Sequence, residues 1–323
     1  MALVLSTHPL HPRAADLISS TATLKVAPSL LPEHLTEEAR DADIIIVRAP
    51  LPPALFAQAP RLRAAIRHGA GVDMIPLEAA TAAGVLVANV PGANARSVAE
   101  YIIFCALALA RRFRIIDCNL RSQGWSSARD HAITTTEISG RTLGLVGMGN
   151  VGRELFKLAH AFNMSVIASK PSIDGMPAGA TIKPLETVIA ESDFLVVCCP
   201  LTATTCGLMN YARIALMKPS AFLINVARGP VVVEADLLQA LDSRSIAGAA
   251  LDVFSQEPLP HNHPLLHREN VLLTPHIAGI TEESMHRMGV GAAREAIRVL
   301  NGELPENLVN PSAITIYRTR FSR

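Results

Sequence analysis

The stretch Leu143-Gly144-Leu145-Val146-Gly147-Met148-Gly149-Asn150-Val151-Gly152 runs from an apolar strand through a glycine-rich turn into the start of a helix. In this GxGxxG spacing, Gly147 permits a tight turn, Gly149 lets an anion approach the backbone, and Gly152 lets the helix pack closely on its strand. Another apolar run, 164–168, follows the helix, as a βαβ unit requires. The context favours a site for the pyrophosphate of a dinucleotide over a glycine turn that binds nothing.

Apolar strands alternate with helical segments on both sides of this turn. The strands expected before it are 2–5, 24–26, 44–47, 64–67 and 86–88. Those expected after it are 164–168, 194–199, 221–226, 247–251 and 271–274. Such alternation is typical of parallel sheets covered by helices. The sequence therefore predicts an α/β fold with two doubly wound parallel sheets, a first unit and a second one beginning near Gly140.

Helical segments link and close these sheets. The segment 98–109 is apolar nearly all round and predicts a buried helix, and the charged run 111–114 after it predicts a solvated or interdomain face. A long helix is expected at 281–300. The last residues, 317–323, are basic and aperiodic, so we expect a frayed tail there.

Composition excludes several classes of protein. The 323 residues suffice for about two domains. Twenty-nine basic and 28 acidic side chains give a net charge of +1, so we expect neither nucleic acid nor a membrane as a partner. The five cysteines form no CxxC pair, and no leader or spanning segment is apparent, so we expect free thiols and a cytoplasmic location. The histidine-rich loop 261–267 lacks metal-ligand spacing, so no metal is expected.

Three segments follow predicted strands at the edge where open α/β sheets bind ligands: 225–229, 252–259 and 274–279. They supply Arg228, whose planar fork can bind a carboxylate, and His276, which can carry a proton. Glu257 can orient that imidazole and favour its charged form. Each of these three side chain types also has a common structural role. Spacing alone therefore does not decide between a catalytic and a structural role.

The order of the motifs resembles that of the D-2-hydroxyacid dehydrogenases, particularly the branch with phosphoglycerate and hydroxypyruvate/glyoxylate enzymes. The likeness runs from about residue 42 to 310 and rests on 67–73, the glycine turn and the three segments above. It implies hydride transfer between NADP(H) or NAD(H) and a small D-2-hydroxy acid or 2-oxo acid, such as glyoxylate, hydroxypyruvate or a 3-phosphoglycerate-like compound. It makes Arg228, Glu257 and His276 the catalytic residues.

The resemblance also implies a domain arrangement. A Rossmann-type nicotinamide-dinucleotide-binding domain, residues 94–280, would be inserted into a flavodoxin-like substrate-binding domain formed by 1–93 and 281–323. Such enzymes are usually homodimers that pair through their cofactor domains. The segment around Trp125 resembles a family segment near that interface.

The ligand contacts that the resemblance implies fall into two sets. The cofactor set is Gly147, Gly149, Asn150, Val151, Gly152, Ser169, Lys170, Cys199, Pro200, Val226, Ala227, Asp252 and Gly279. The substrate set is Arg48 and the backbone N–H groups of Ala70, Gly71 and Val72. Arg48 and Arg67 either contact a second anionic group of the substrate or pair with local carboxylates, and the sequence leaves both alternatives open.

One departure from the family pattern bears on the cofactor. An NAD enzyme of this type carries an acidic residue about 20 positions past the glycines, where it holds the ribose hydroxyls. This chain has Ala168-Ser169-Lys170-Pro171-Ser172 there. Because Lys170 can pair with a 2′-phosphate, NADP(H) is favoured, with NAD(H) still possible.

Two alternatives remain open, and the first of them belongs to another functional class. Some transcriptional corepressors resemble this family, so a non-catalytic NAD(H)-sensing module is the second hypothesis. Oxidation of a simpler anion, such as formate or phosphite, is the third.

Overall fold

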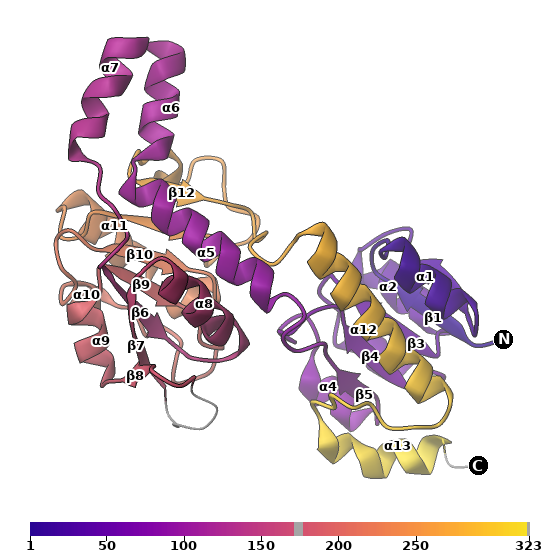
Figure 1. Ribbon diagram of the computed structural model, residues 1–323. Helices are drawn as coiled ribbons and strands as arrows, with labels where there is room; N and C mark the ends of the chain where they lie inside the picture. The colour runs from indigo at the N-terminus through magenta and orange to yellow at the C-terminus, as the bar shows by residue number, and fades with distance from the viewer. Residues whose placement is uncertain (171–176, 322–323) are drawn as a thin grey trace. The chain divides into compact units, whose positions relative to one another are not determined.

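The computed structural model describes residues 1–170 and 177–321 (Figure 1). The chain forms two compact units. Unit 1 contains Met1–Asn94 and Ile280–Arg323, and unit 2 is the continuous segment Ala95–Gly279.

Unit 1 is built on a five-stranded parallel sheet of order β2-β1-β3-β4-β5. The strands are β1 (Leu3–Ser6), β2 (Thr23–Val26), β3 (Ile44–Val47), β4 (Ala64–Arg67) and β5 (Leu86–Ala88). The helices are α1 (Pro12–Ser19), α2 (Pro32–Ala39), α3 (Ala54–Gln58), α4 (Leu77–Ala82), α12 (Glu282–Leu300) and α13 (Ile314–Phe321). This strand order is that of flavodoxin-like folds, as expected.

The helix α12 completes the core of unit 1. Its N-terminus is fixed by a capping box in which Thr281 and Ser284 bond each other's backbone N–H. Ala292, Ala293 and Val299 on its buried face share a core with residues of the first strands. The helix lies beside α1, which comes from the opposite end of the chain (Figure 1).

Unit 2 is built on a seven-stranded parallel sheet of order β12-β11-β10-β9-β6-β7-β8. The strands are β6 (Thr142–Val146), β7 (Ser165–Ser169), β8 (Thr181–Ile182), β9 (Phe194–Val197), β10 (Phe222–Asn225), β11 (Gly248–Leu251) and β12 (Val271–Leu273). The main helices are α5 (Ala95–Ala110), α8 (Asn150–Ala161), α9 (Leu185–Glu191), α10 (Tyr211–Ile214) and α11 (Glu234–Asp242). This is the Rossmann order with one strand added, so the predicted fold class is confirmed.

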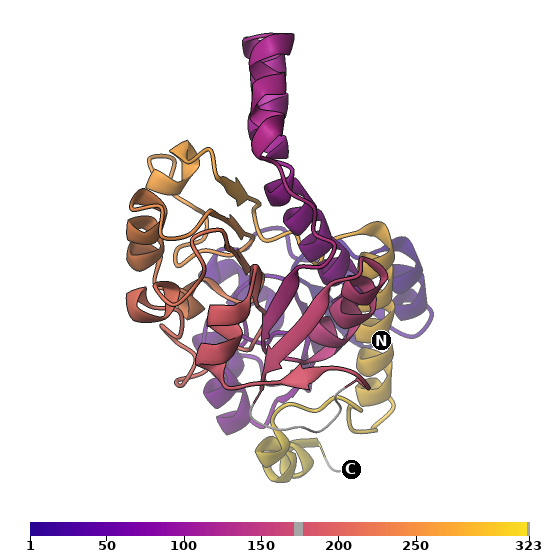
Figure 2. The ribbon, with the colours of Figure 1, turned by 60° about the vertical axis from the view of Figure 1, so that its left-hand side comes forward.

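A pair of helices projects from unit 2. The helices α6 (Phe113–Ser122) and α7 (Trp125–Asp130) form an arm that stands away from the sheet in both views (Figures 1 and 2). The arm exposes large apolar side chains, with Trp125 70% exposed and Ile133, just beyond α7, 83% exposed. The sequence did not reveal these helices, because the turn between α5 and α6 depends on Arg112 adopting a left-handed backbone with φ of 51°.

The expected frayed tail is wrong. Residues Ile314–Phe321 form α13, and Tyr317 on this helix is buried. The guanidinium of Arg320 donates hydrogen bonds to the carbonyl oxygens of Ala83 and Pro60. These contacts with distant segments stabilise a helix that its own sequence pattern does not predict.

Smaller differences concern the ends of elements. Most strands begin or end one or two residues from their expected limits, and the short edge strand β8 was not expected. None of the helices in the described part of the chain is long and apolar enough to cross a membrane.

Candidate active site

The carboxyl ends of all seven strands of unit 2 lie at one edge of the sheet, because the strands are parallel. The glycine turn follows β6 at this edge. Gly147 has φ of 105° and donates its N–H to the carbonyl oxygen of Ser169, at 2.9 Å, at the end of β7. A Cβ atom on Gly147 would lie 3.0 Å from the Cα of Cys199, just past β9. The turn is therefore enclosed by the ends of two neighbouring strands.

The glycine turn fits a bound pyrophosphate. A Cβ atom on Gly149 would meet no heavy atom within 4 Å, so the backbone there is open to a ligand. At Gly152 a Cβ atom would lie 2.8 Å from the Sδ of Met148 and 3.2 Å from the carbonyl oxygen of Gly147, so a side chain there would crowd the glycine turn. The first N–H groups of α8, from Asn150 onward, have no acceptor within the helix and face this opening.

Burial keeps the two thiols beside the turn in their protonated form. Cys198 donates its Sγ–H to the carbonyl oxygen of Gly147 at 3.1 Å. Burial raises the pKa of Cys198 to about 12 and also raises the pKa of Cys199. Both therefore remain protonated at neutral pH, and Cys199 and the exposed Pro200 line the edge next to the turn.

Ser169 and Lys170 lie at the end of β7, where the sequence predicts the residues that contact the ribose of the cofactor or its 2′-phosphate. The hydrogen bond from Gly147 fixes the backbone of Ser169 beside the turn. Lys170 is half-buried. Pro171 and Ser172, which complete the segment used for the cofactor argument, lie outside the described residues.

The loop after β10 is organised by Asn225, a residue to which the sequence analysis gave no role. Its side chain is 1% exposed, accepts a hydrogen bond from the N–H of Ala227 at 3.1 Å and donates to the carbonyl oxygen of Arg228 at 3.2 Å. An asparagine at the end of a buried strand was the available signal. The side chain of Asn225 thus fixes the backbone of Val226, Ala227 and Arg228. One Nη1–H of Arg228 also donates to the carbonyl oxygen of Ala227.

The structure brings the loops of the three predicted catalytic residues into contact. A Cβ atom on Gly229 would lie 1.9 Å from the carbonyl of Phe254, so only glycine lets the Arg228 loop pack there. The N–H of Phe254 donates to Oε1 of Glu257 at 3.1 Å. The other oxygen of Glu257, Oε2, lies 3.0 Å from Nδ1 of His276.

His276 has a strained backbone with φ of 57°, which is uncommon for a residue with a side chain. Its N–H donates to the carbonyl oxygens of Asp252, at 2.8 Å, and Thr274, at 3.0 Å. Within the described residues, Nε2 of His276 makes no hydrogen bond, so it is available to a ligand.

Asp252 holds the loop that carries His276. Its carboxylate is 2% exposed and accepts hydrogen bonds from the Thr274 hydroxyl and from the N–H groups of Ile277 and Ala278. This structural role was not predicted. The contact between Asp252 and a cofactor stays a prediction, as does that of Gly279 at the end of the loop.

The predicted substrate residues lie in unit 1, at the carboxyl ends of β3 and β4. Three consecutive carbonyl oxygens after β4 accept hydrogen bonds. The carbonyl oxygen of Gly69 accepts from the N–H of Val90, that of Ala70 from Nδ2 of Asn89, and that of Gly71 from Nε of Arg67. Because C=O and N–H point in opposite directions in a trans peptide, the next three N–H groups face away from these donors. Within the described residues, the N–H groups of Ala70, Gly71 and Val72 have no acceptor, and such a row suits an anion.

Two basic side chains adjoin this loop. Arg48 donates from Nη1 to the carbonyl oxygen of Pro9 at 2.6 Å, and within the described residues it pairs with no carboxylate. Among the described residues, the alternative of a local ion pair therefore has no support for Arg48. His68 is 3% exposed, and burial together with the charge of Arg48 lowers its pKa to about 4.

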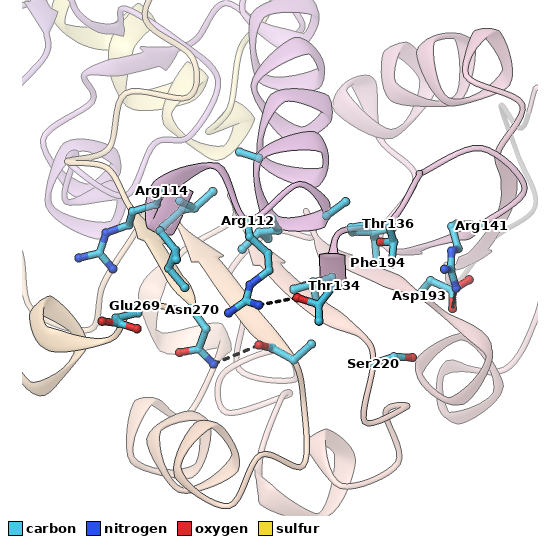
Figure 3. A pocket seen from close by; sticks show the side chains of 17 residues that line it. Arg112, Arg114, Thr134, Thr136, Arg141, Asp193, Phe194, Ser220, Glu269 and Asn270 are labelled. Carbon is cyan, nitrogen blue, oxygen red and sulfur yellow. Dashed lines mark hydrogen bonds and ion pairs between the residues drawn. The ribbon is translucent and has the colours of Figure 1, made fainter. Parts of the chain in front are cut away.

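A separate pocket of about 350 Å³ lies at the opposite edge of unit 2 (Figure 3). Its lining includes Phe194 and Phe222, which begin β9 and β10 at their amino ends. Arg112 donates to Thr134 there, and Asn270 donates to the carbonyl oxygen of Ala247. The pocket shares no residue with the glycine turn or the predicted catalytic residues.

Comparison with known proteins identifies the family. A family model described as D-isomer specific 2-hydroxyacid dehydrogenase, NAD binding domain, matches residues 103–278, more than half of the chain. The chain belongs to the D-isomer specific 2-hydroxyacid dehydrogenases. These dehydrogenases are NAD(P)-dependent oxidoreductases, so the predicted enzyme class is confirmed.

Two relatives of this dehydrogenase are similar over most of its length. It is 37% identical over 316 residues to a D-3-phosphoglycerate dehydrogenase of Methanocaldococcus jannaschii, covering 96% of this chain and 60% of that protein. It is also 37% identical over 291 residues to a glyoxylate reductase of Thermofilum pendens, covering 88% and 86%. The chain thus spans less than two thirds of the first relative and most of the second.

A solved structure agrees with this family. An NADPH-dependent glyoxylate/hydroxypyruvate reductase of Sinorhizobium meliloti, in complex with NADP and malonate, matches with a TM-score of 0.85 and 28% identity. The match covers 97% of each chain. These relatives are enzymes, and none of them supports the corepressor hypothesis.

Proposed function

We propose that this dehydrogenase reduces a small 2-oxo acid of the glyoxylate or hydroxypyruvate type to the D-2-hydroxy acid, reversibly and with NADP(H). The observation that carries the proposal is the Glu257–His276 pair, with Oε2 and Nδ1 3.0 Å apart and Nε2 available to a ligand. This pair adjoins the Arg228 loop, at the sheet edge that carries the glycine turn. The similarity to glyoxylate reductases supports the choice of substrate.

Each catalytic residue has a distinct role in this proposal. His276 donates the proton on Nε2 to the carbonyl oxygen of the substrate and takes it back in the oxidative direction. Glu257 accepts the Nδ1–H of His276, which fixes the ring and stabilises its charged form. Arg228 binds the carboxylate and carbonyl oxygen of the substrate through its planar fork.

The residues around the glycine turn would hold the cofactor. The open backbone at Gly149 and the N-terminus of α8 suit the pyrophosphate, with Asn150 and Val151 beside it. When bound, a nicotinamide exchanges hydride with C2 of the substrate. We propose that Lys170 pairs with a 2′-phosphate and thereby favours NADP(H), as the sequence predicts.

We propose that the N–H groups of Ala70, Gly71 and Val72 also bind the substrate carboxylate. Their row of donors without acceptors supports this role. Arg48 would contact the group at the far end of the substrate, because its guanidinium has a carbonyl and no carboxylate as partner among the described residues.

We propose that the enzyme is a homodimer in which the α6–α7 arm packs against a second copy. Exposed Phe113, Leu120, Trp125 and Ile133 on and near the arm support this arrangement, since isolated domains seldom expose so many large apolar side chains together. We also propose a cytoplasmic location, because all five cysteines are free thiols, which persist in reducing compartments.

The test of the proposed function is the initial rate of reduction of glyoxylate, hydroxypyruvate and 3-phosphohydroxypyruvate, each with NADPH and with NADH. We expect the first two substrates with NADPH to give the highest kcat/KM. A preference for the phosphorylated substrate would move the assignment to the phosphoglycerate branch. Cofactor binding without turnover of any 2-oxo acid would contradict the proposal.

A further inference from the structure

We propose that Tyr101 is a positioning residue for His276 and that it acts through the hydroxyl of Thr274 and the carboxylate of Asp252. The proposal rests on the proposed function, because it takes His276 as the proton carrier. It adds a residue of helix α5, 175 positions before His276 in the sequence, that reaches His276 only through other residues.

Tyr101, Thr274 and Asp252 are linked in a row by hydrogen bonds, and the available donors determine the direction of each bond. The Thr274 hydroxyl lies 2.6 Å from Oδ1 of Asp252 and 2.6 Å from the hydroxyl of Tyr101. An ionised carboxylate only accepts, so the single proton of Thr274 points to Asp252. The oxygen of Thr274 must then accept its other hydrogen bond from Tyr101. Burial raises the pKa of Tyr101, so its phenol keeps the proton that this role requires.

This arrangement sets the orientation of Asp252, which in turn holds the loop of His276. Oδ1 of Asp252 also accepts from the N–H of Ile277 at 2.8 Å, and Oδ2 accepts from the N–H of Ala278 at 2.9 Å. These two amides directly follow His276. The loop is therefore wrapped around one buried carboxylate, with the Thr274 hydroxyl at one end and two amides at the other.

The loop needs such support because His276 is in the left-handed region. A residue with a Cβ atom is strained in that conformation and keeps it only where its surroundings over-determine it. Without the Tyr101 hydroxyl, the oxygen of Thr274 loses its donor, and the hydroxyl is freer to turn away from Asp252. We expect the imidazole then to spend less time in the orientation that places Nδ1 against Glu257.

The packing of helix α5 holds the Tyr101 side chain in place. It lies on α5, a helix of 16 residues with a largely buried surface that packs against α8 and against β10, β11 and β12. The ring itself is half-buried, and Cys105, one turn further along the helix, is fully buried. The helix therefore holds the phenol against the strand ends that carry Asp252 and Thr274.

The experiment compares Tyr101→Phe, Thr274→Val and Thr274→Ser with the full-length enzyme. We expect Tyr101→Phe to lower kcat about fivefold to tenfold, as loss of one partly buried hydrogen bond allows, with KM for the 2-oxo acid nearly unchanged. Thr274→Val should lower kcat at least as much, and Thr274→Ser should restore it. The double variant Tyr101→Phe/Thr274→Val should be no worse than Thr274→Val alone, because both changes break one chain of bonds.

A second readout needs neither substrate nor cofactor. The imidazole signals of His276 in the NMR spectrum, assigned with His276→Gln, report its hydrogen bond to Glu257. We expect them to shift or broaden in Tyr101→Phe and to be normal in Thr274→Ser. Tyr211→Phe is the matched control, since the exposed Tyr211 hydroxyl makes no hydrogen bond among the described residues.

The proposal is overturned if Tyr101→Phe leaves both kcat and the His276 signals unchanged, or if the effects of Tyr101→Phe and Thr274→Val on kcat multiply. A wild-type enzyme without turnover would contradict the proposed function alone, because the NMR comparison would still test the link between Tyr101 and His276.

Discussion

Oε2 of Glu257 lies 3.0 Å from Nδ1 of His276, while Oε1 of the same carboxylate accepts a hydrogen bond from the N–H of Phe254 at 3.1 Å. One carboxylate is thus anchored to the backbone on one side and orients an imidazole on the other. We expect His276→Gln to lower kcat by about 10²- to 10⁴-fold, the usual contribution of a proton carrier, with little change in the Kd of the cofactor. Glu257→Gln should have a smaller effect in the same direction. Stopped-flow turnover and cofactor titration measure both, and near-normal kcat in His276→Gln would exclude it as proton carrier.

Arg228→Lys tests whether the planar fork matters or only the charge. A lysine keeps the cation but cannot donate two parallel hydrogen bonds to a carboxylate. We expect kcat/KM for the 2-oxo acid to fall about 10- to 100-fold, through both a higher KM and a lower kcat. Arg213→Lys, in the same unit but on α10, is the control. Equal kinetics in Arg228→Lys and the wild type would show that the fork does not bind substrate.

Lys170→Asp tests the choice of cofactor. An aspartate can accept hydrogen bonds from ribose hydroxyls and repels a 2′-phosphate. We expect the ratio of kcat/KM for NADPH to that for NADH to fall about 10-fold or more. Lys157→Asp, on the exposed side of α8, should leave this ratio unchanged. An unaltered ratio in Lys170→Asp would remove Lys170 from the cofactor assignment.

His68 makes the stability of unit 1 depend on pH. Its pKa in the folded protein is about 4, below the ordinary 6.5, because burial and Arg48 disfavour the charged imidazole. As pH falls below 6.5, the unfolded chain takes up this proton first, so the folded state loses stability until about pH 4. We expect the free energy of unfolding in urea to fall by about 3 kcal/mol more in the wild type than in His68→Gln over that range. Exposed His34→Gln is the control, and parallel pH profiles for His68→Gln and the wild type would contradict the effect.

The arm tests the proposed dimer. We expect Trp125→Ser and Ile133→Ser to convert a species of two chains into a single chain at micromolar concentration, because each change places a hydroxyl in an apolar contact. Light scattering coupled to gel filtration measures the mass. Leu216→Ser, which changes an exposed leucine away from the arm, should have no effect. A wild-type mass equal to one chain would end the dimer proposal.

Sequence patterns were sufficient where local structure follows local composition. The buried runs that form β3 and β9 and the glycines before α8 are local signals, and both sheets could be predicted from signals of that kind. The helix α13 could not, because its stability depends on carbonyl groups near Ala83 and Pro60 that are distant in sequence.

The candidate site shows the same limit. The residue types of Arg228, Glu257 and His276 suggested their chemistry. The hydrogen bond between Tyr101 and Thr274 joins two residues 173 positions apart, and neither residue is unusual in its own segment of sequence. Asn225 and Asp252 orient two loops because they are buried beside backbone N–H groups, which only the folded structure brings together.

The packing of α12 against the first strands has a consequence for the order in which the protein is made. Unit 2 is one uninterrupted segment, 95–279, and all of its strands have emerged before α12 is synthesised. Unit 1 lacks the alanines of α12 in its core until residues beyond 280 leave the ribosome. Since domains fold as units during synthesis, the inserted unit is the first to finish, and the first 94 residues wait for the last ones with part of their apolar surface uncovered. We therefore expect the uncovered sheet of unit 1 to be exposed to aggregation during synthesis until α12 covers it.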